Sequence, residues 1–122
     1  MDSKPVKILV ADDEPRVLRF IEISLKVRGF EVDCVTSGEE VLEHVRNDEP
    51  DLLLLDIVMP DMNGFEVLQR LREFSDLPVI AFSASGINRY EAIRSGANEF
   101  VNKPFNPDEI ISKVTALIGR NP

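Results

Sequence analysis

Five polar side chains in this chain of 122 residues stand directly after short apolar stretches, where a buried strand would end. They are two neighbouring acids, a third acid, a hydroxyl and an amine: Asp12, Asp13, Asp56, Ser83 and Lys103. Carboxylates that meet repel one another unless a cation neutralises them, and Mg²⁺ prefers such oxygen ligands. A lysine nearby favours an anion that arrives with the metal, such as a phosphoryl group. Together these groups indicate phosphoryl transfer, which depends on positioning and charge neutralisation, with a carboxylate as the attacking group.

The clearest positioning element is a run of four leucines, residues 52–55, which Asp56 follows directly. The run is bounded by Pro50 and Pro60 and is too short for an ordinary helix. A continuous apolar run of this length is typical of a strand that is buried on both faces. Similar runs predict four more strands, at residues 7–11, 30–35, 77–82 and 97–101.

A helix pattern follows each of these strands. Ser37 and Glu40 have the spacing of a capping box, and Asn106 followed by Pro107 is a strong helix start. Apolar residues at helical spacing, with glycines as stops, predict helices at 15–28, 37–47, 65 to about 74, 88–95 and 107–118. In the fourth of these helices we expect Tyr90 and Ile93 to point inward.

Strand and helix alternate five times, which predicts an α/β fold with a parallel sheet and helices on both faces. Crossover connections in such a sheet are right-handed. No linker or repeat interrupts the pattern, so residues 1–122 are predicted to form one domain with its core at about 7–118. In open α/β sheets the ligand crevice lies outside the carboxyl ends of the strands. The five polar side chains should therefore meet at one edge.

Composition narrows the functional classes. The formal net charge of −8 works against binding a nucleic-acid backbone and favours a cation or a basic partner. No apolar run is long enough to cross a bilayer, and residues 1–5 do not begin a secretory signal. Cys34 is the only cysteine, so no disulfide forms within the chain. We expect a cytoplasmic protein.

Each polar residue also has a purely structural interpretation. The acids Asp12 and Asp13 would favour the start of a helix through its dipole. Ser83 would be an ordinary turn residue, and Lys103 a solvated surface lysine. His44 is best interpreted as a solvated residue on its helix.

The order of the motifs resembles the receiver domain of two-component response regulators. The matching pieces are Asp12-Asp13, the stretch 56–60 (Asp-Ile-Val-Met-Pro) with Gly64, Ser83-Ala84, and the stretch 103–105 (Lys-Pro-Phe). The resemblance extends from about residue 7 to 118. It implies the flavodoxin-like (βα)5 fold, a five-stranded parallel sheet in the order 2-1-3-4-5.

The resemblance assigns roles around the three acids. Asp56 corresponds to the phosphoacceptor, which takes a phosphoryl group from the phosphohistidine of a partner kinase. Asp13 and Asp56 correspond to direct ligands of Mg²⁺ or Mn²⁺, and Asp12 to a ligand acting through water. The backbone carbonyl of Val58 is a further ligand by the same comparison. Lys103 corresponds to the residue that pairs with the phosphoryl oxygens.

The remaining positions concern the switch. By resemblance, the Ser83 hydroxyl and the Ala84 backbone amide bind the phosphoryl group. Phe100 corresponds to the switch aromatic, although an aromatic near a strand end is equally well explained as core. The Lys103-Pro104 peptide bond is expected to be cis. The segment between Ser83 and Lys103 is shorter than in typical members, by roughly half a helical turn, so partner-binding residues are not carried over there.

The implied function is phosphorelay signal transduction. Such a domain is not an enzyme acting on free substrates; phosphorylation shifts its affinity for a downstream protein or an output domain. Its partners are a sensor histidine kinase or phosphotransfer protein, with no nucleic acid and no membrane. A Mg²⁺-dependent phosphatase with an aspartate nucleophile is the alternative, although Val58 stands where such enzymes place a second carboxylate. A flavin or nucleotide carrier is disfavoured because no glycine-rich loop follows the first strand.

Overall fold

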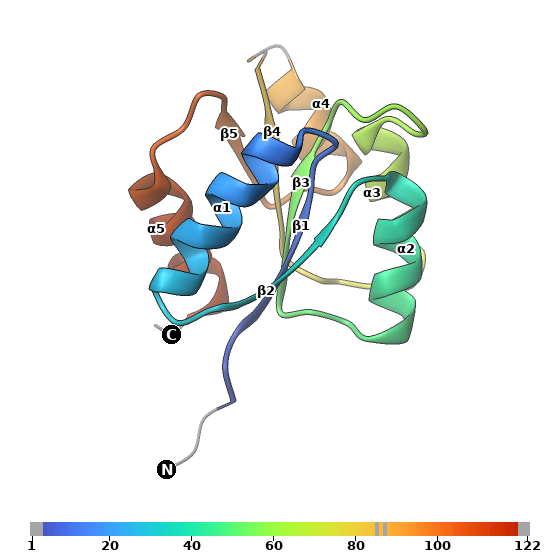
Figure 1. The fold of residues 1–122 in the computed structure, drawn as a ribbon. Coiled ribbons are helices and arrows are strands. Elements are labelled where there is room, and N and C mark those ends of the chain that lie inside the picture. The colour runs from blue at the N-terminus through green and yellow to red at the C-terminus, as the bar shows by residue number, and fades with distance from the viewer. Residues whose placement is uncertain (1–3, 85, 87, 120–122) are drawn as a thin grey trace.

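The computed structural model describes residues 4–84, 86 and 88–119 (Figure 1). Its five strands form one parallel sheet in the order β2-β1-β3-β4-β5, as predicted. Strands and helices alternate along the chain: β1 (Lys7–Ala11), α1 (Pro15–Val27), β2 (Glu31–Val35), α2 (Gly38–Asn47), β3 (Leu52–Asp56), α3 (Gly64–Leu71), β4 (Val79–Ser83), α4 (Asn88–Ser95), β5 (Glu99–Asn102) and α5 (Pro107–Ile118).

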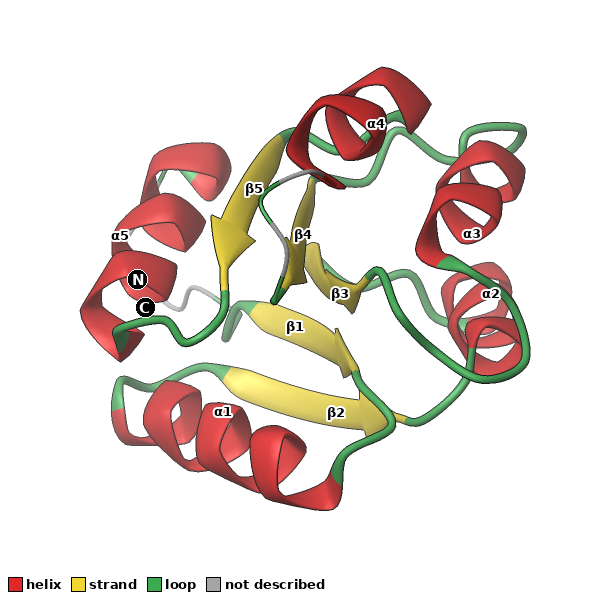
Figure 2. Ribbon diagram, turned by 90° about the horizontal axis from the view of Figure 1, so that it is seen from above, coloured by secondary structure: helices red, strands yellow, loops and turns green. Residues whose placement is uncertain are grey.

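The helices cover both faces of the sheet (Figure 2). Helices α1 and α5 lie on one face, and α2, α3 and α4 lie on the other. The run of leucines in β3 supplies both cores in alternation, because successive strand residues point to opposite faces. Leu53 and Leu55 belong to the cluster under α2 and α3, whereas Leu52 and Leu54 belong to the cluster under α1 and α5. All four are 0% exposed, which explains why this strand is continuously apolar.

Local signals set the ends of several helices. The Ser37 side chain accepts a hydrogen bond from the Glu40 N–H at 3.2 Å and caps α2 as predicted. The returning bond differs from the usual box, because the Glu40 carboxylate accepts from the backbone N–H of Thr36 and from the Ser37 hydroxyl rather than from the backbone N–H of Ser37. Asn106 caps α5 through the N–H of Asp108. Gly119 ends α5 at a φ of 78°, a left-handed conformation that suits glycine.

Two expectations about helices were wrong. Helix α3 ends at Leu71, before the expected end near residue 74, because the next residues bond three positions back and tighten into turns. In α4, Tyr90 is 71% exposed and Ile93 is 45% exposed, so neither points inward. The buried residues of that helix are Ala92 and Ser95, whose small side chains allow close packing. No helix in the described part of the chain is long and apolar enough to span a bilayer.

Candidate functional site

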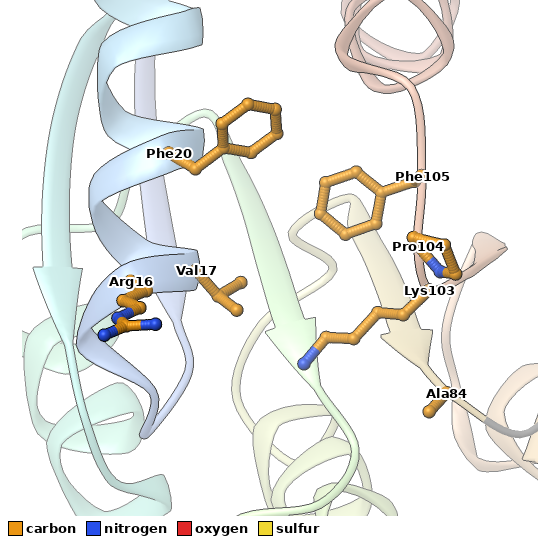
Figure 3. A pocket seen from close by; sticks show the side chains of 7 residues that line it. All are labelled: Arg16, Val17, Phe20, Ala84, Lys103, Pro104 and Phe105. Carbon is orange, nitrogen blue, oxygen red and sulfur yellow. The ribbon is translucent and has the colours of Figure 1, made fainter.

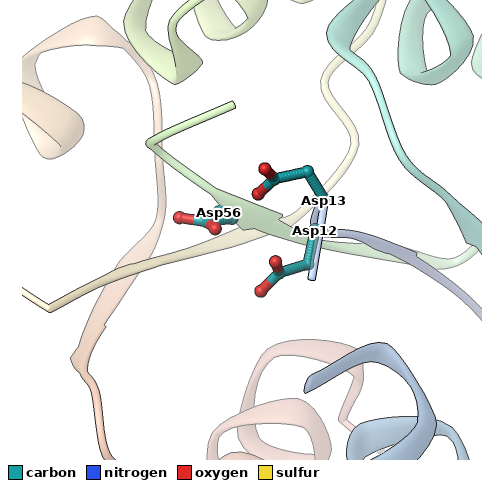
Figure 4. Close-up of side chains that lie close together, drawn as sticks. All are labelled: Asp12, Asp13 and Asp56. Atoms are coloured by element: carbon teal, nitrogen blue, oxygen red, sulfur yellow. The ribbon is translucent and has the colours of Figure 1, made fainter. Parts of the chain in front are cut away.

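Three carboxylates meet at the carboxyl edge of the sheet, as the sequence predicted (Figure 4). Asp56 ends β3, and Asp12 and Asp13 follow β1 directly. The pairing of Ala11 with Leu55 brings the ends of these two strands together. One ligand atom from each of the three acids lies within 4.8 Å of the other two. Asp12 is fully buried, Asp56 is 4% exposed and Asp13 is exposed, so the cluster opens to solvent through Asp13.

Backbone N–H groups orient the two buried acids. The Glu14 N–H donates to Asp12 Oδ1 at 2.8 Å, and the Val58 N–H donates to Asp56 Oδ1 at 3.0 Å. In both cases an aspartate binds the backbone two residues on, the geometry of an Asx turn. One oxygen of each carboxylate is thereby held by its own loop. The other oxygen, Oδ2 in both residues, is directed at Lys103.

The Lys103 amine bridges the two buried acids. Its Nζ lies 3.1 Å from Asp12 Oδ2 and 3.3 Å from Asp56 Oδ2, and 3.8 Å from Glu14. The side chain is only 17% exposed, which excludes the interpretation as a solvated surface lysine. Burial lowers the pKa of Lys103, but the hydrogen bond to Asp12 and the charge of Asp56 outweigh it and leave that pKa raised. The amine therefore stays protonated at neutral pH.

The electrostatics of Asp56 differ from those of an ordinary aspartate. The pKa of Asp56 is raised to about 6, chiefly by burial and also by the negative charge of Asp12. The Val58 N–H and the Lys103 amine act in the opposite direction. A carboxylate with this pKa is ionised above pH 6 but poorly compensated. A buried carboxylate with a raised pKa is a candidate functional group.

Ser83 lies at the same edge, on the neighbouring strand. It ends β4, is 2% exposed, and its Oγ accepts a hydrogen bond from Asn88 Nδ2 at 2.8 Å. A cavity of about 550 Å³ joins Ser83 to the acids and is also lined by Lys103 and Ala84. The structure therefore brings the five predicted polar residues and Ala84 to one region.

The predicted switch and loop positions have distinct environments. Phe100 lies in the middle of β5 and is 1% exposed, which agrees with a core residue and leaves its switch role a prediction. The Val58 side chain is 65% exposed. The predicted role of the Val58 backbone carbonyl as a metal ligand remains a prediction. The Lys103–Pro104 peptide bond is cis, as the resemblance implied.

An apolar pocket of about 370 Å³ adjoins the acidic site (Figure 3). It lies between α1 and the segment after β5, and its lining is Arg16, Val17, Phe20, Ala84, Lys103, Pro104 and Phe105. The Lys103 side chain passes along this pocket and points its amine toward the acids. The pocket therefore shares one wall with the acidic site.

Two contacts of the site were missed from the sequence. Asn88 was assigned only as the start of a helix, yet it donates to Ser83. Glu14 was assigned only to the first turn of a helix, yet its carboxylate faces Lys103. Neither residue has a sequence signal beyond helix-start chemistry. His44 is partly buried and pairs with Asp33 at 3.2 Å, so it is less solvated than expected.

Comparison with known proteins identifies the family. The model of the response regulator receiver domain matches residues 8–115. The transcriptional regulatory protein KdpE of Mycobacterium tuberculosis is 39% identical over 116 residues, 93% of this chain and 51% of that protein. The DNA-binding response regulator MtrA of Mycolicibacterium smegmatis is 37% identical over 123 residues, 99% of this chain and 54% of that protein. The chain thus spans about half the length of these relatives.

Solved structures share the fold. A response regulator from Chloroflexus aurantiacus superposes with a TM-score of 0.91 and 31% identity, covering 96% of this chain and 100% of that one. The receiver domain of the Francisella response regulator 1452 superposes with a TM-score of 0.88 and 33% identity, covering 96% and 98% of the two chains. The fold, the site and these matches agree with the resemblance seen in the motifs. The chain belongs to the family of receiver domains of two-component response regulators.

Proposed function

We propose that Asp56 accepts a phosphoryl group from the phosphohistidine of a partner histidine kinase or phosphotransfer protein. The observation that carries this proposal is the bridge of Lys103 between Asp12 and Asp56, beside a third acid within 4.8 Å. An ammonium group among carboxylates is suited to receive phosphoryl oxygens. Asp56 is the acceptor because it is the buried acid with the pKa raised to about 6 that also lines the open cavity.

The acidic cluster fits Mg²⁺ or Mn²⁺. Asp12, Asp13 and Asp56 each offer an oxygen within 4.8 Å of the other two, and Lys103 pairs with Asp12 and Asp56. Hard oxygen ligands of this kind suit these ions. Asp13 and Asp56 would hold the ion directly. By the same resemblance, Asp12 would act through water, while its oxygens accept bonds from the Glu14 N–H and from Lys103. When bound, the ion neutralises the charge of the acids and of the phosphoryl oxygens. The Val58 backbone carbonyl completes the proposed ligand set.

Each residue of the site has its own role in the transfer of the phosphoryl group. An Asp56 carboxylate oxygen forms the new bond to phosphorus as the bond to the donor nitrogen breaks, and the donor imidazole keeps the electron pair. Lys103 neutralises one phosphoryl oxygen. The Ser83 hydroxyl and the Ala84 N–H donate to the others, since both residues line the same cavity. Above pH 6 Asp56 is ionised and able to attack.

The consequence of phosphorylation is a change in affinity for another protein or an output domain. KdpE and MtrA carry names of transcriptional and DNA-binding regulators, and each is about twice as long as this chain. The formal net charge of −8 on the 122 residues makes this chain itself unsuited to binding DNA. The domain acts as one unit in the cytoplasm. Phe100 would carry the change by shifting as Ser83 moves toward the phosphoryl group.

The phosphatase alternative gains no support. It needs a second carboxylate two residues after the nucleophile, and that position holds an exposed valine, Val58. The chain's own chemistry is thus limited to gaining and losing its phosphoryl group.

Intact mass spectrometry tests the proposal. The protein is incubated with Mg²⁺ and acetyl phosphate, and an adduct of one phosphoryl group that hydroxylamine removes is the expected result. Asp56→Asn should abolish it, whereas Asp76→Asn, a change at an exposed aspartate outside the cavity, should not. An undiminished adduct on Asp56→Asn, or no adduct on the native chain, would contradict the proposal.

A further inference from the structure

The loop between β3 and α3 forms one wall of the acidic cavity. The cavity of about 550 Å³ beside Asp56 is lined on this side by three consecutive residues of the loop, Val58, Met59 and Pro60. The same loop carries the Val58 backbone carbonyl, the proposed metal ligand. A loop that must become ordered when its ligand binds reduces the affinity. Whatever fixes this loop beforehand should therefore strengthen the binding of the cation.

Backbone hydrogen bonds fix the two ends of the loop. The Ile57 N–H donates to the carbonyl oxygen of Phe82 on β4 at 3.0 Å. The Gly64 N–H, at the start of α3, donates to the carbonyl oxygen of Ile57 at 2.7 Å. These bonds hold the beginning and the end of the loop close together. The position of its outer part, residues 59–62, depends on further contacts.

One carboxylate ties the outer part of the loop to the start of α2. The Gly38 N–H donates to Asp61 Oδ1 at 3.0 Å, and the Glu39 N–H donates to Asp61 Oδ2 at 3.1 Å. These bonds, that from Gly38 first, hold the pKa of Asp61 below its ordinary value, so the side chain is an anion at neutral pH. The partners are 23 and 22 residues apart in the sequence, so the contact joins two distant elements.

Apolar packing accompanies these polar bonds. A Cβ on Gly38 would lie 3.2 Å from Met62 Cβ and 2.7 Å from Val67 Cγ2, so the loop, α2 and α3 approach closely here. Met59 is buried in the core cluster under α2 and α3, and the Met62 side chain packs against that cluster. Loss of the Asp61 bonds should thus loosen the outer loop while these apolar contacts keep the domain folded.

We propose that Asp61 is a positioning residue that anchors the β3–α3 loop to α2 and so keeps the Val58 carbonyl in place before the cation binds. This inference rests on the proposed function, in which that carbonyl is a metal ligand. Asp61 acts through the loop backbone and is not a ligand itself. Its loss should weaken Mg²⁺ binding, because the loop must then be ordered as the ion binds. Once Mg²⁺ saturates the site, the transfer to Asp56 should proceed as before.

Mg²⁺ titrations of the native chain and Asp61→Ala test this role. The dependence of urea unfolding on Mg²⁺ gives a dissociation constant by linkage, without any phosphoryl donor. The rate of adduct formation with acetyl phosphate gives a half-saturating Mg²⁺ concentration. We expect both constants to rise by about three- to tenfold in Asp61→Ala, the range of one net hydrogen bond. The rate at saturating Mg²⁺ should match that of the native chain.

Two control variants at the start of α2 separate the loop from other effects. Ser37→Ala removes the local cap, whose Oγ accepts from the Glu40 N–H at 3.2 Å, and should lower stability as Asp61→Ala does. Glu39→Gln removes an exposed charge but keeps the backbone N–H that binds Asp61. Neither control should change the Mg²⁺ constants. Asp61→Asn, which retains one acceptor oxygen, replaces Asp61→Ala if the latter unfolds, and should raise both constants by a smaller factor.

The outcomes distinguish the inference from the proposed function. If Asp61→Ala and Asp61→Asn bind Mg²⁺ as the native chain does, the inference fails while the proposed function stands. Ser37→Ala or Glu39→Gln with an equal rise in the constants would overturn the inference in favour of general damage to α2 or loss of charge. If the native chain forms no adduct, phosphoryl transfer has failed, and the unfolding titration alone decides the role of Asp61. A native chain whose unfolding does not respond to Mg²⁺ would overturn the inference.

Discussion

The backbone N–H of Lys103 donates to the carbonyl oxygen of Ser83 at 2.8 Å. This bond continues the pairing of β4 with β5 by one residue beyond Ser83 and Asn102. The lysine and the serine are thus fixed relative to each other by the sheet, although their side chains leave from different strands. Because β3 pairs with β4, the same ladder also sets the place of Asp56. Any change that shifts one strand end should disturb the whole site.

The first prediction concerns the charge balance at Lys103. Lys103→Met should lower the free energy of unfolding at pH 7.5 without metal by roughly 2 to 4 kcal/mol, because two buried acids lose their cation. Urea unfolding measures the change. Lys113→Met, which removes a more exposed pair with Glu99, should cost only about 0 to 1 kcal/mol. Equal losses of unfolding free energy in the two variants would show that Lys103 stabilises the buried acids no more than an exposed ion pair stabilises the surface.

The second prediction is a pH dependence set by Asp56. Its pKa is about 6 in the folded protein, against about 3.9 in an unfolded chain. Between these values the folded state binds more protons, so stability falls as pH rises from about 4 to 6. The full loss is on the order of 3 kcal/mol. Asp56→Asn removes the ionisation and should be more stable than the native chain at pH 7.5 without metal.

Unfolding midpoints at two pH values check this sign. The advantage of Asp56→Asn should shrink at pH 4, where Asp56 is protonated in the folded state and only about half ionised in the unfolded state. An advantage that is equal at pH 4 and 7.5 would mean that the ionisation of Asp56 has no energetic role.

The third prediction concerns the metal. Mg²⁺ should raise the melting temperature of the native chain, and removing it with EDTA should reverse the rise, because the ion binds the folded acids preferentially. Asp13→Asn should blunt that response and stabilise the metal-free protein, since one of three crowded charges is gone. Differential scanning fluorimetry measures both effects. Destabilisation of the metal-free form would show that the acids do not repel one another appreciably.

The fourth prediction concerns the strand that carries Asp56. Leu54→Ala should cost about 2 to 5 kcal/mol, because Leu54 is 0% exposed and its truncation leaves a cavity under α1 and α5. Val27→Ala, at a residue of α1 that is 77% exposed, should change stability by less than about 0.5 kcal/mol. Chemical denaturation gives both values. A small loss for Leu54→Ala would show that the core relaxes around the gap.

Much of the fold was determined by local sequence. The leucines of β3 are apolar at every position because both faces of that strand are covered, and a continuous run reports this directly. Asp12, Asp13, Asp56, Ser83 and Lys103 were found because each follows such a run. Parallel strands end at one edge, so their meeting followed from the topology.

Other features depended on tertiary packing. The outward direction of Tyr90 and Ile93 in α4 is set by which face of that short helix meets its neighbours, and the sequence pattern predicted the wrong face. Gly64 was recognised only as part of the motif that follows Asp56. Its fold requirement is steric, because a Cβ there would lie 2.6 Å from the Ile57 backbone.

The sequence by itself determined which residues come to the edge of the sheet. Short apolar runs mark where the buried strands end, and their alternation with helices makes the strands parallel. Only the tertiary structure decided their energetics: the raised pKa of Asp56, the double bridge of Lys103 and the bond from Asn88 to Ser83. These depend on burial and on atom positions within a few ångströms. Such quantities arise from how distant elements pack, and no local pattern of residues encodes them.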